Sequence, residues 1–320
     1  MRVVTVGEAL AVFRSSVEEP LWRADRVALG TGGAEANVAM TLAHRGIPVT
    51  WAGRVGDDAL GRRVIRELRA EGVHVLATVD SERPTGLLVK DLHPGGRTTI
   101  SYYRANSAGS ALAVGDLAGV ELGPDVLVHV TGITAALSAG AAEAIVHLID
   151  AAREAGSLVS FDVNHRPRLW GTVSPIEHYT ALASRADVVF ASLDEVPLLM
   201  ALPRAGLGST EQMGAAAAAL AEAGYSHVVV TAGAAGSAAR ENGTACAQPA
   251  LPTGVVDSVG AGDAFVGGYL SSWLRGEPMV SRLHSAAVSG AAACRSSGDW
   301  EGAVDLSGVG ADDTTDLVSR

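Results

Sequence analysis

The stretch Gly260-Ala261-Gly262-Asp263 has the residue types and the spacing that an anion site beside a base would need. Where a turn of small residues enters a helix, several backbone N–H groups stay free at the positive end of the helix dipole and can bind an anion. Gly260, Ala261 and Gly262 would let a phosphate approach the backbone, and Asp263 could take a proton from an attacking hydroxyl. Phosphoryl transfer requires little beyond positioning, charge neutralisation and a base, so the stretch predicts that chemistry.

A simpler interpretation of this stretch is that the glycines only form a turn and that Asp263 only begins a helix. Two further glycines in the same predicted helix, Gly267 and Gly268, favour the functional interpretation. Each glycine inside a helix costs about 1 kcal/mol relative to alanine. Their presence indicates that something packs closely against this helix.

A second glycine-rich stretch precedes another predicted helix near the N-terminus. Gly32 and Gly33, which open the helix, would bring the backbone against a ligand, and Asn37, one helical turn later, offers a donor and an acceptor to a polyol. Further along, Asp57-Asp58 is more typical of a helix cap than of a catalytic pair. Each of these signals is weak when it is taken alone.

The composition is that of an ordered globular protein that handles a small ligand. The 320 residues are 48% hydrophobic and 18% charged, which is enough apolar surface to offset the entropy lost on folding. The formal net charge is -11 and no basic block occurs, which argues against a nucleic-acid partner. No stretch resembles a membrane span or a signal peptide, and the two cysteines lie far apart. We therefore expect a reducing cytoplasm as the location.

Lysine is almost absent, because Lys90 is the one lysine of the chain. Schiff-base chemistry, pyridoxal phosphate and the G-x-x-x-x-G-K-[ST] phosphate loop all need a lysine, and no such loop surrounds Lys90. The nine histidines form no H-E-x-x-H pair, and no G-x-S-x-G elbow occurs. These patterns exclude P-loop kinases and disfavour zinc proteases and ordinary α/β hydrolases. A genomic bias toward arginine is a sufficient cause of the scarcity of lysine.

The elements that must position these residues alternate along the chain between short β-branched apolar runs and helical patterns. The runs predict strands at 3–6, 49–52, 126–130, 158–162, 188–191 and 227–231. Between them, helices are predicted at 34–45, 59–71, 139–155 and 215–222. Repeated strand–helix units predict an α/β fold with a mostly parallel, doubly wound sheet, in which ligands bind beyond the carboxyl ends of the strands.

Two segments, 12–29 and 85–104, interrupt this alternation and are predicted to form short strands. The second segment contains a hairpin turn at 93–97. Inserted strands of this kind form either a small separate sheet that covers the ligand crevice or an extension of the sheet edge, and the sequence does not decide between them. The tail after Gly302 is rich in Asp, Gly, Ser and Thr and is expected to fray.

In combination, these stretches resemble the two signatures of the ribokinase-like (PfkB-type) carbohydrate kinases. The resemblance rests on Gly-Gly-x-x-x-Asn with the later Gly-Arg-Val-Gly-x-Asp, and on Asp-x-Val-Gly-Ala-Gly-Asp-Ala-Phe at 257–265. It covers nearly the whole chain. It implies a single kinase domain over 1–320, a Rossmann-like αβα sandwich with a small β-sheet lid. It also implies that ATP with Mg²⁺ phosphorylates a sugar hydroxyl and that the chain forms a homo-oligomer through the lid.

Within that family, the likeness is greatest to the kinases of 2-keto-3-deoxygluconate. The stretches that carry it lie at 102–112, 131–134, 162–166 and 298–303. It implies that Asp263 is the base and that a sugar acid contacts Gly33, Ala34, Asn37, Tyr102, Arg104, Arg166, Asp263 and Asp299. Fructose and other neutral ketohexoses are the alternative substrates. A regulatory module that binds a sugar without turnover is the alternative of another class, although it would be expected to lack the base.

The residues themselves agree with an acidic substrate. Alternate side chains of a strand share a face, so Tyr102 and Arg104 would point together while Tyr103 points away. Arg104 from the lid and Arg166 from the sheet could both approach a carboxylate, which suits the planar guanidinium group. The alternative is that these are two surface arginines among many. At Leu88 the similar enzymes often carry a tyrosine that contacts substrate, so one contact is in doubt.

On the nucleotide side, the resemblance implies a set of residues around ATP, with two departures from the family pattern. The set is Asn164, Ser192, Glu195, Thr231, Gly233, Gly236, Gly260 and Gly262. Ser192 stands where the family has asparagine, and Glu195 would act on Mg²⁺ through a bound water. The turn 231–236 lacks a basic residue that many relatives have. Asp257 and the carbonyl of Val259 are implied as a site for a monovalent cation such as K⁺.

Overall fold

The computed structural model describes residues 1–16, 19–93, 97–200 and 210–304. Residues 94–96 of the predicted hairpin turn, and the tail from 305 onward, lie outside the described residues. The larger of two sheets has nine strands in the order β13-β12-β11-β10-β9-β8-β1-β4-β5. Its strands from β11 to β5 pair in parallel, and β12 and β13 add an antiparallel edge.

All six strands predicted from β-branched runs are present in this main sheet. The nine strands are β1 (Arg2–Val6), β4 (Val49–Gly56), β5 (His74–Asp80), β8 (Val126–Thr131), β9 (Leu158–Asp162), β10 (Val188–Ser192), β11 (His227–Thr231), β12 (Ser237–Glu241) and β13 (Thr244–Gln248). The sequence pattern did not predict β5, β12 or β13. The predicted strands are those buried on both faces, where a continuous apolar run is the expected signal.

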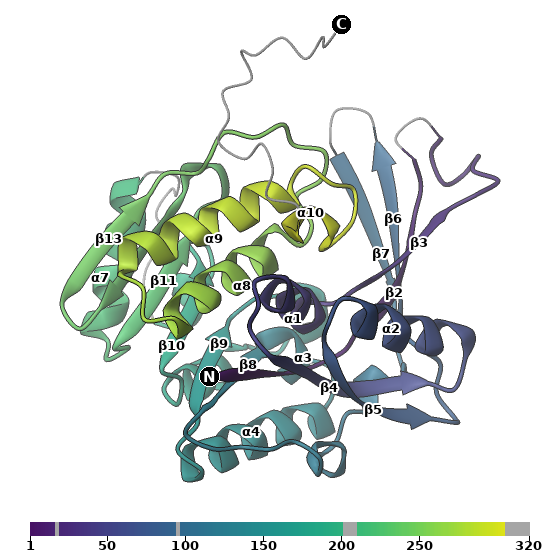
Figure 1. The fold of residues 1–320 in the computed structure, drawn as a ribbon, viewed down its shortest axis with the longest axis horizontal. Helices are drawn as coiled ribbons and strands as arrows, with labels where there is room; N and C mark the ends of the chain where they lie inside the picture. Colours follow the sequence, from purple (N-terminus) through teal and green to yellow (C-terminus); the bar gives the residue numbers. More distant parts are fainter. Residues whose placement is uncertain (17–18, 94–96, 201–209, 305–320) are drawn as a thin grey trace, which may run out of the picture.

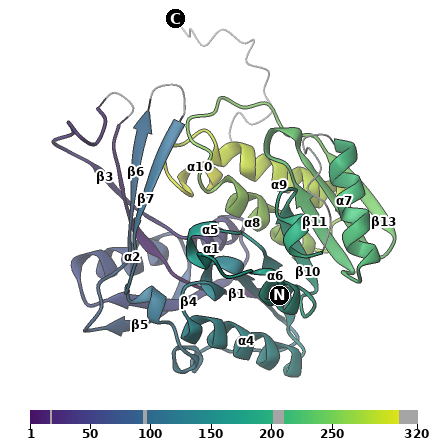
Figure 2. The same ribbon diagram turned by 180° about the vertical axis from the view of Figure 1, so that it is seen from behind.

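Helices cover both faces of the main sheet (Figures 1 and 2). One face packs on α1 (Ala34–His44), α2 (Ala59–Ala70), α8 (Ala261–Leu274) and α9 (Met279–Ala293). The other packs on α4 (Ala139–Glu154), α6 (Ile176–Ala183) and α7 (Thr210–Glu222). Successive side chains of a strand point to opposite faces, so Val3 joins the first core and Val4 the second. The predicted αβα sandwich is confirmed.

The remaining helical elements are short and lie in connections. They are α3 (Gly132–Ala135), α5 (Pro167–Trp170), α10 (Glu301–Val304) and four turns of 3₁₀ helix, η1 (Gly109–Ala111), η2 (Val114–Leu117), η3 (Val196–Leu198) and η4 (Gly233–Ala235). In the described part of the chain, no helix is long and apolar enough to cross a membrane.

The two interrupting segments form a small sheet of their own, so they do not extend the main sheet. Its order is β3 (Ala28–Gly32), β2 (Leu10–Arg14), β6 (Leu87–His93) and β7 (Arg97–Tyr103). The parallel pairing of β2 with β6 joins the two segments. Leu10, Val12 and Leu88 form its apolar core, with Ile100 packed against them. Figures 1 and 2 show this sheet standing beside the main sheet, as predicted for a lid.

The two glycines inside α8 are explained by close helix packing. An ideal Cβ on Gly267 would lie 2.7 Å from Cβ of Thr41 in α1, and one on Gly268 would lie 2.4 Å from the hydroxyl of Ser289 in α9. Side chains at these positions would force the three helices apart. The close packing inferred from the sequence is therefore confirmed, and it fixes α8 between α1 and α9.

We expect the substitution Gly268→Ala to lower the free energy of unfolding by roughly 1–3 kcal/mol, because the added methyl overpacks the contact with α9. The matched control is Gly214→Ala in α7, where the methyl would meet nothing within 4 Å. That substitution should raise stability by up to about 1 kcal/mol, through helix propensity alone. Urea unfolding of both variants measures the difference, and equal effects of the same sign would contradict the packing argument.

Candidate active site

Three adjoining cavities lie beside the carboxyl ends of strands of the main sheet. The central pocket (530 Å³) is lined by Asp162, Ser192 and Thr231, which end β9, β10 and β11, and by the start of α8. The arginine pocket (1010 Å³) shares Tyr102, Arg166 and Arg168 with it. The glycine-rich pocket (760 Å³) shares Thr231, Ser258, Gly262 and Phe265 with it. The three cavities therefore form one trough with the central pocket in the middle.

The carboxylate of Asp263 lies in the central pocket, held by two side-chain amides. Nδ2 of Asn37 donates to its Oδ2 at 2.8 Å, and Nδ2 of Asn164 donates to its Oδ1 at 3.2 Å. Burial raises the pKa of Asp263 to about 7, while the hydrogen bond from Asn37 acts in the opposite direction. A carboxylate poised near neutral pH can take a proton from a hydroxyl and release it again.

The backbone turn before Asp263 lies where the sequence predicted an anion site, and binding of an anion there stays a prediction. Gly260 caps α8 in the left-handed conformation, with φ of 81°. A Cβ there would lie 1.8 Å from the carbonyl oxygen of Asp299, so a side chain is excluded. Gly260 and Gly262 line the central pocket and Ala261 lines the glycine-rich pocket. The first turn of α8 thus presents its N–H groups between the two cavities.

Two further carboxylates face Asp263 in the central pocket. Glu195 accepts the N–H of His165 at 2.5 Å and the N–H of Ser192 at 2.8 Å. Asp162 accepts from Nδ2 of Asn164 at 3.1 Å. Burial, together with repulsion from Glu195 and Asp263, raises the pKa of Asp162 well above its ordinary value. The three carboxyl groups share the pocket with the side chains of Arg166 and Arg168.

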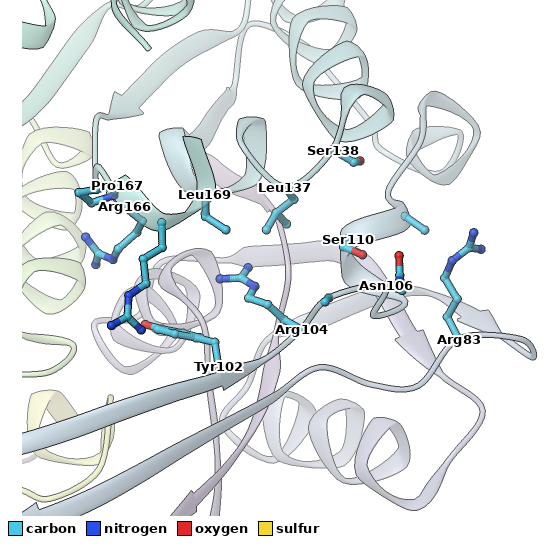
Figure 3. Close-up of a pocket in the computed structure, with 13 residues that line it drawn as sticks. Arg83, Tyr102, Arg104, Asn106, Ser110, Leu137, Ser138, Arg166, Pro167 and Leu169 are labelled. Atoms are coloured by element: carbon cyan, nitrogen blue, oxygen red, sulfur yellow. The ribbon is translucent and has the colours of Figure 1, made fainter. Parts of the chain in front are cut away.

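The arginine pocket brings together Tyr102, Arg104 and Arg166, as predicted (Figure 3). Tyr102 and Arg104 share a side of the strand, while Tyr103 points away and is 65% exposed. The Arg104 guanidinium lies 5.6 Å from the centre of the Tyr102 ring, within the range of a cation–π contact. Figure 3 shows Arg166 across the pocket from Arg104, beside Pro167 and Leu169.

The two arginines differ in how far the protein already neutralises them. Arg104 forms an ion pair with the buried carboxylate of Glu8, although its Nε has no hydrogen-bond partner among the described residues. Arg166 is exposed, and its Nη1 donates to its own neighbour, the carbonyl of His165, at 3.1 Å. No carboxylate forms an ion pair with Arg166 among the described residues, although its charge lowers the pKa of the nearby Asp162 and Asp263. Arg166 is thus better placed than Arg104 to hold a carboxylate of the substrate.

Gly33 and Ala34 lie at the start of α1, below the small sheet. Gly33 has φ of 129°, and a Cβ there would lie 2.4 Å from the carbonyl oxygen of Glu8. Neither residue lines the three cavities described above, so their predicted contact with substrate stays a prediction. Asn37, in the same helix, reaches the site through Asp263.

The predicted nucleotide residues divide between two cavities. Asn164, Ser192 and Glu195 line the central pocket, and Thr231 lines both. Gly233 and Gly236 line the glycine-rich pocket. Gly236 has φ of 109°, and a Cβ there would lie 2.3 Å from the carbonyl oxygen of Gln248, which explains why glycine is needed.

The structure also contains an ion cluster that sequence analysis missed. Lys90 in β6 pairs with Asp257 and, at 2.8 Å, with Asp299. All three side chains are buried, and neither aspartate lines the three cavities. The predicted roles of Asp257 as a cation ligand and of Asp299 as a substrate contact thus stay predictions. The isolation of a single lysine was the one sequence signal that could have pointed to this cluster.

Comparison with known proteins identifies the family. The family model described as pfkB family carbohydrate kinase matches residues 1–304. The chain belongs to this family. The 2-dehydro-3-deoxygluconokinase of Bacillus subtilis (strain 168) is 35% identical over 304 residues, which cover 93% of this chain and 91% of the relative. This chain is therefore a carbohydrate kinase, as the sequence motifs predicted.

Solved structures agree with this placement. The 2-dehydro-3-deoxygluconokinase of Thermotoga maritima superposes with a TM-score of 0.85 at 25% identity, covering 94% of this chain and 95% of that one. A fructokinase double mutant of Vibrio cholerae O395, with fructose, ADP and a potassium ion bound, gives a TM-score of 0.78 at 26% identity and covers 95% of both chains. The ribokinase-like fold predicted for this kinase is confirmed.

The position of Asp263 predicts an acid limb in the pH dependence of turnover. Below pH about 7 the carboxyl group is protonated and cannot accept a proton, so kcat/KM for the sugar should fall by roughly tenfold per pH unit. Asn37→Leu removes a hydrogen bond that lowers this pKa and should move the limb to higher pH. Steady-state rates across pH 5–9 measure both.

The control for this experiment is Thr41→Val, one turn along α1, where the hydroxyl donates only to the carbonyl of Asn37 at 2.9 Å. That variant should keep the pH limb of the parent. A limb that lies at the same pH in Asn37→Leu and in the parent would show that another group titrates.

Proposed function

We propose that this kinase transfers the γ-phosphoryl group of ATP to the terminal 6-hydroxyl of 2-keto-3-deoxygluconate (2-dehydro-3-deoxygluconate) or a close sugar acid. The observation that carries the proposal is the order of the three cavities along one trough. The arginine pocket lies at one end, the glycine-rich pocket at the other, and Asp263 with the start of α8 between them. An acid acceptor and a nucleotide held at the two ends would meet at Asp263.

In the mechanism that this geometry supports, Asp263 accepts the proton of the sugar hydroxyl as its oxygen attacks the γ-phosphorus. The N–H groups at the first turn of α8 receive the negative charge of the transferring phosphoryl group. Asn37 and Asn164 hold the carboxylate of Asp263 in place. ADP leaves through the glycine-rich pocket, and Asp263 then gives up its proton to the solvent.

The residues present fit a divalent cation that is held through water. Within the described residues, no group of three histidine, cysteine or acidic side chains could ligate a metal directly. However, Asp162 and Glu195 lie close enough in the central pocket to raise the pKa of Asp162 by repulsion. Mg²⁺ keeps several of its waters in proteins. When bound with ATP, it would neutralise phosphate charge beside Glu195.

The positive charge of Arg166, in the arginine pocket, favours an acidic substrate. Glu8 balances Arg104, but Arg166 has no carboxylate partner among the described ion pairs, and Nε of Arg104 has no acceptor. Leu88 is buried in the core of the small sheet and has no hydroxyl group with which to replace the tyrosine contact of similar enzymes. Neutral ketohexoses remain the alternative, supported by the likeness to a fructokinase.

Homo-oligomerisation through the small sheet also remains a proposal. That sheet exposes Leu29 and Tyr103, with exposed fractions of 39% and 65%. Exposed apolar side chains on a sheet are the kind of surface that a second copy could cover.

The experiment that tests the proposed reaction is a coupled assay of ADP formation, with ATP and Mg²⁺, across 2-keto-3-deoxygluconate, fructose and other ketohexoses. We expect the highest kcat/KM on the sugar acid. A higher kcat/KM on fructose would replace the acid with the neutral alternative.

The substitution Arg166→Met tests whether Arg166 binds the carboxylate of the sugar acid. It keeps bulk but removes a charge-assisted contact worth about 1.5–3 kcal/mol, so kcat/KM on the acid should fall roughly tenfold or more. A neutral ketose has no carboxylate to lose, so the ratio of acid to fructose should collapse. Arg185→Met is the matched control, because Arg185 pairs only with the exposed Asp150 at 3.4 Å and should leave the ratio unchanged. An unchanged ratio in Arg166→Met would place carboxylate recognition elsewhere.

Asp263→Asn separates a kinase from a sugar-binding module without turnover. The substitution removes the proton acceptor, so kcat should fall by roughly 100-fold or more, while calorimetry should show nearly the same affinity for the sugar. Near-normal kcat in this variant would remove Asp263 from the role of base. A parent protein that binds the sugar acid but turns over none of the acceptors would support the binding module instead.

A further inference from the structure

The single lysine of the chain is completely buried. The exposed fraction of the Lys90 side chain is 0%, and those of its partners Asp257 and Asp299 are 1% and 3%. Lysine is almost never fully buried unless it is paired, because an ammonium group loses its hydration there. The burial of Lys90 therefore calls for a specific structural explanation.

The ammonium group of Lys90 is surrounded by three oxygen atoms. Nζ donates to Oδ1 of Asp299 at 2.8 Å and to the carbonyl oxygen of Ser297 at 3.1 Å, and it forms an ion pair with Oδ2 of Asp257. Carboxylate and carbonyl oxygens that surround a single positive charge are the same groups that would surround a bound cation. The ammonium group of Lys90 thus occupies the place that a bound cation would take in this cluster.

Both aspartates belong to the segments that shape the anion-binding turn. Oδ1 of Asp257 accepts the N–H of Val259 at 3.2 Å, immediately before Gly260. The backbone carbonyl of Asp299 lies against Gly260 so closely that no Cβ fits there. Hence the ammonium of Lys90 holds together two chain segments between which the turn at Gly260 is formed.

The same cluster connects the turn to the small sheet. Lys90 belongs to β6, and the hydroxyl of Thr98 in β7 donates to Oδ1 of Asp257 at 3.0 Å. Strand β7 also carries Tyr102, which lines both the arginine pocket and the central pocket. One cluster of buried charges therefore connects strand β7, on the acceptor side of the trough, with the turn before α8 on the other side.

We propose that Lys90 is a positioning residue whose ammonium group acts as a resident cation, holding the turn 257–260 in the geometry that binds phosphate. It takes over the task that a potassium ion at Asp257 and the Val259 carbonyl would have, so turnover requires no added monovalent cation. Lys90 does not line the three cavities and acts through Asp257 and Asp299. The proposal rests on the proposed function only where kcat is measured, because the measurement of ATP affinity needs no sugar.

The first test uses the unaltered protein. Its kcat and its ATP affinity, measured at fixed ionic strength in potassium, sodium and tetramethylammonium chloride, should agree within twofold. A several-fold stimulation by potassium would overturn the proposal, because the cation would then come from solution.

The second test replaces the lysine in two ways. Lys90→Ala removes the ammonium and leaves space for an ion, so kcat should fall tenfold or more in tetramethylammonium chloride and recover in part as potassium or ammonium ions are added. Lys90→Met also removes the charge but fills the space with its side chain, so it should show the same loss without recovery. Rescue of the alanine variant alone is a result that general loss of stability would not produce.

The matched control is Arg14→Met. Arg14 in β2 forms another ion pair between the small sheet and the C-terminal part, with Glu301 at 2.9 Å, but it does not touch Asp257. It should keep kcat within twofold and show no response to potassium. A Lys90→Ala protein that is folded and retains parental kcat without potassium would overturn the proposal. If that variant does not fold, the measurements of the parent protein in the three chloride salts still test the proposal.

ATP affinity separates this proposal from the proposed function. Calorimetric titration with ATP and Mg²⁺ needs no sugar, so it reports on the turn even if no acceptor tested is phosphorylated. We expect Lys90→Ala to bind ATP at least tenfold more weakly than the parent, with recovery in potassium. Equal affinities in the parent and in a folded Lys90→Ala variant would overturn the proposal.

Discussion

The contact of Gly260 with the carbonyl oxygen of Asp299 is the constraint on which the rest of the site depends. Glycine has no Cβ, so the chain can adopt a left-handed conformation there in contact with this carbonyl, and α8 begins at the next residue. The start of α8 then fixes both the free N–H groups and the carboxylate of Asp263. Gly267 and Gly268 allow the helix to pack closely against α1 and α9, so a shift of Asp263 along the trough would require these helices to repack. Positioning of this kind is most of what phosphoryl transfer asks of a protein.

Within the described residues, ion pairs attach the small sheet to the body of this kinase at three places. Arg14 pairs with Glu301, Lys90 with the two aspartates, and Arg104, just after β7, with Glu8. Buried pairs contribute little net stability, because desolvation offsets much of their attraction. They do fix orientation, since a misplaced buried charge is costly. The ion pairs thus help to fix the orientation of the small sheet, whose own apolar core consists of Leu10, Val12 and Leu88.

The sequence was sufficient to predict those features whose causes are local. Strands buried on both faces read as apolar runs, and the turn before Asp263 reads as small residues that enter a helix. The strands β12 and β13 gave no such signal, because their sequences, SAARE and TACAQ, contain no run of β-branched apolar residues. The cluster around Lys90 could not be read from spacing, since Lys90 and Asp299 are 209 residues apart in the chain. The pairing of Arg104 with Glu8 escaped prediction for the same reason, and it changes which arginine is open to a ligand.

The complete burial of the only lysine has a consequence for the chemistry of the protein surface. While this kinase is folded, its side chains offer no primary amine to an acylating reagent, because the ammonium of Lys90 is enclosed by Asp257, Asp299 and Ser297. Acylation of that amine requires the small sheet to separate from the body and the lysine to lose its proton. The rate at which an amine reagent modifies Lys90 therefore reports how often the small sheet separates from the body, and the measurement needs no engineered label.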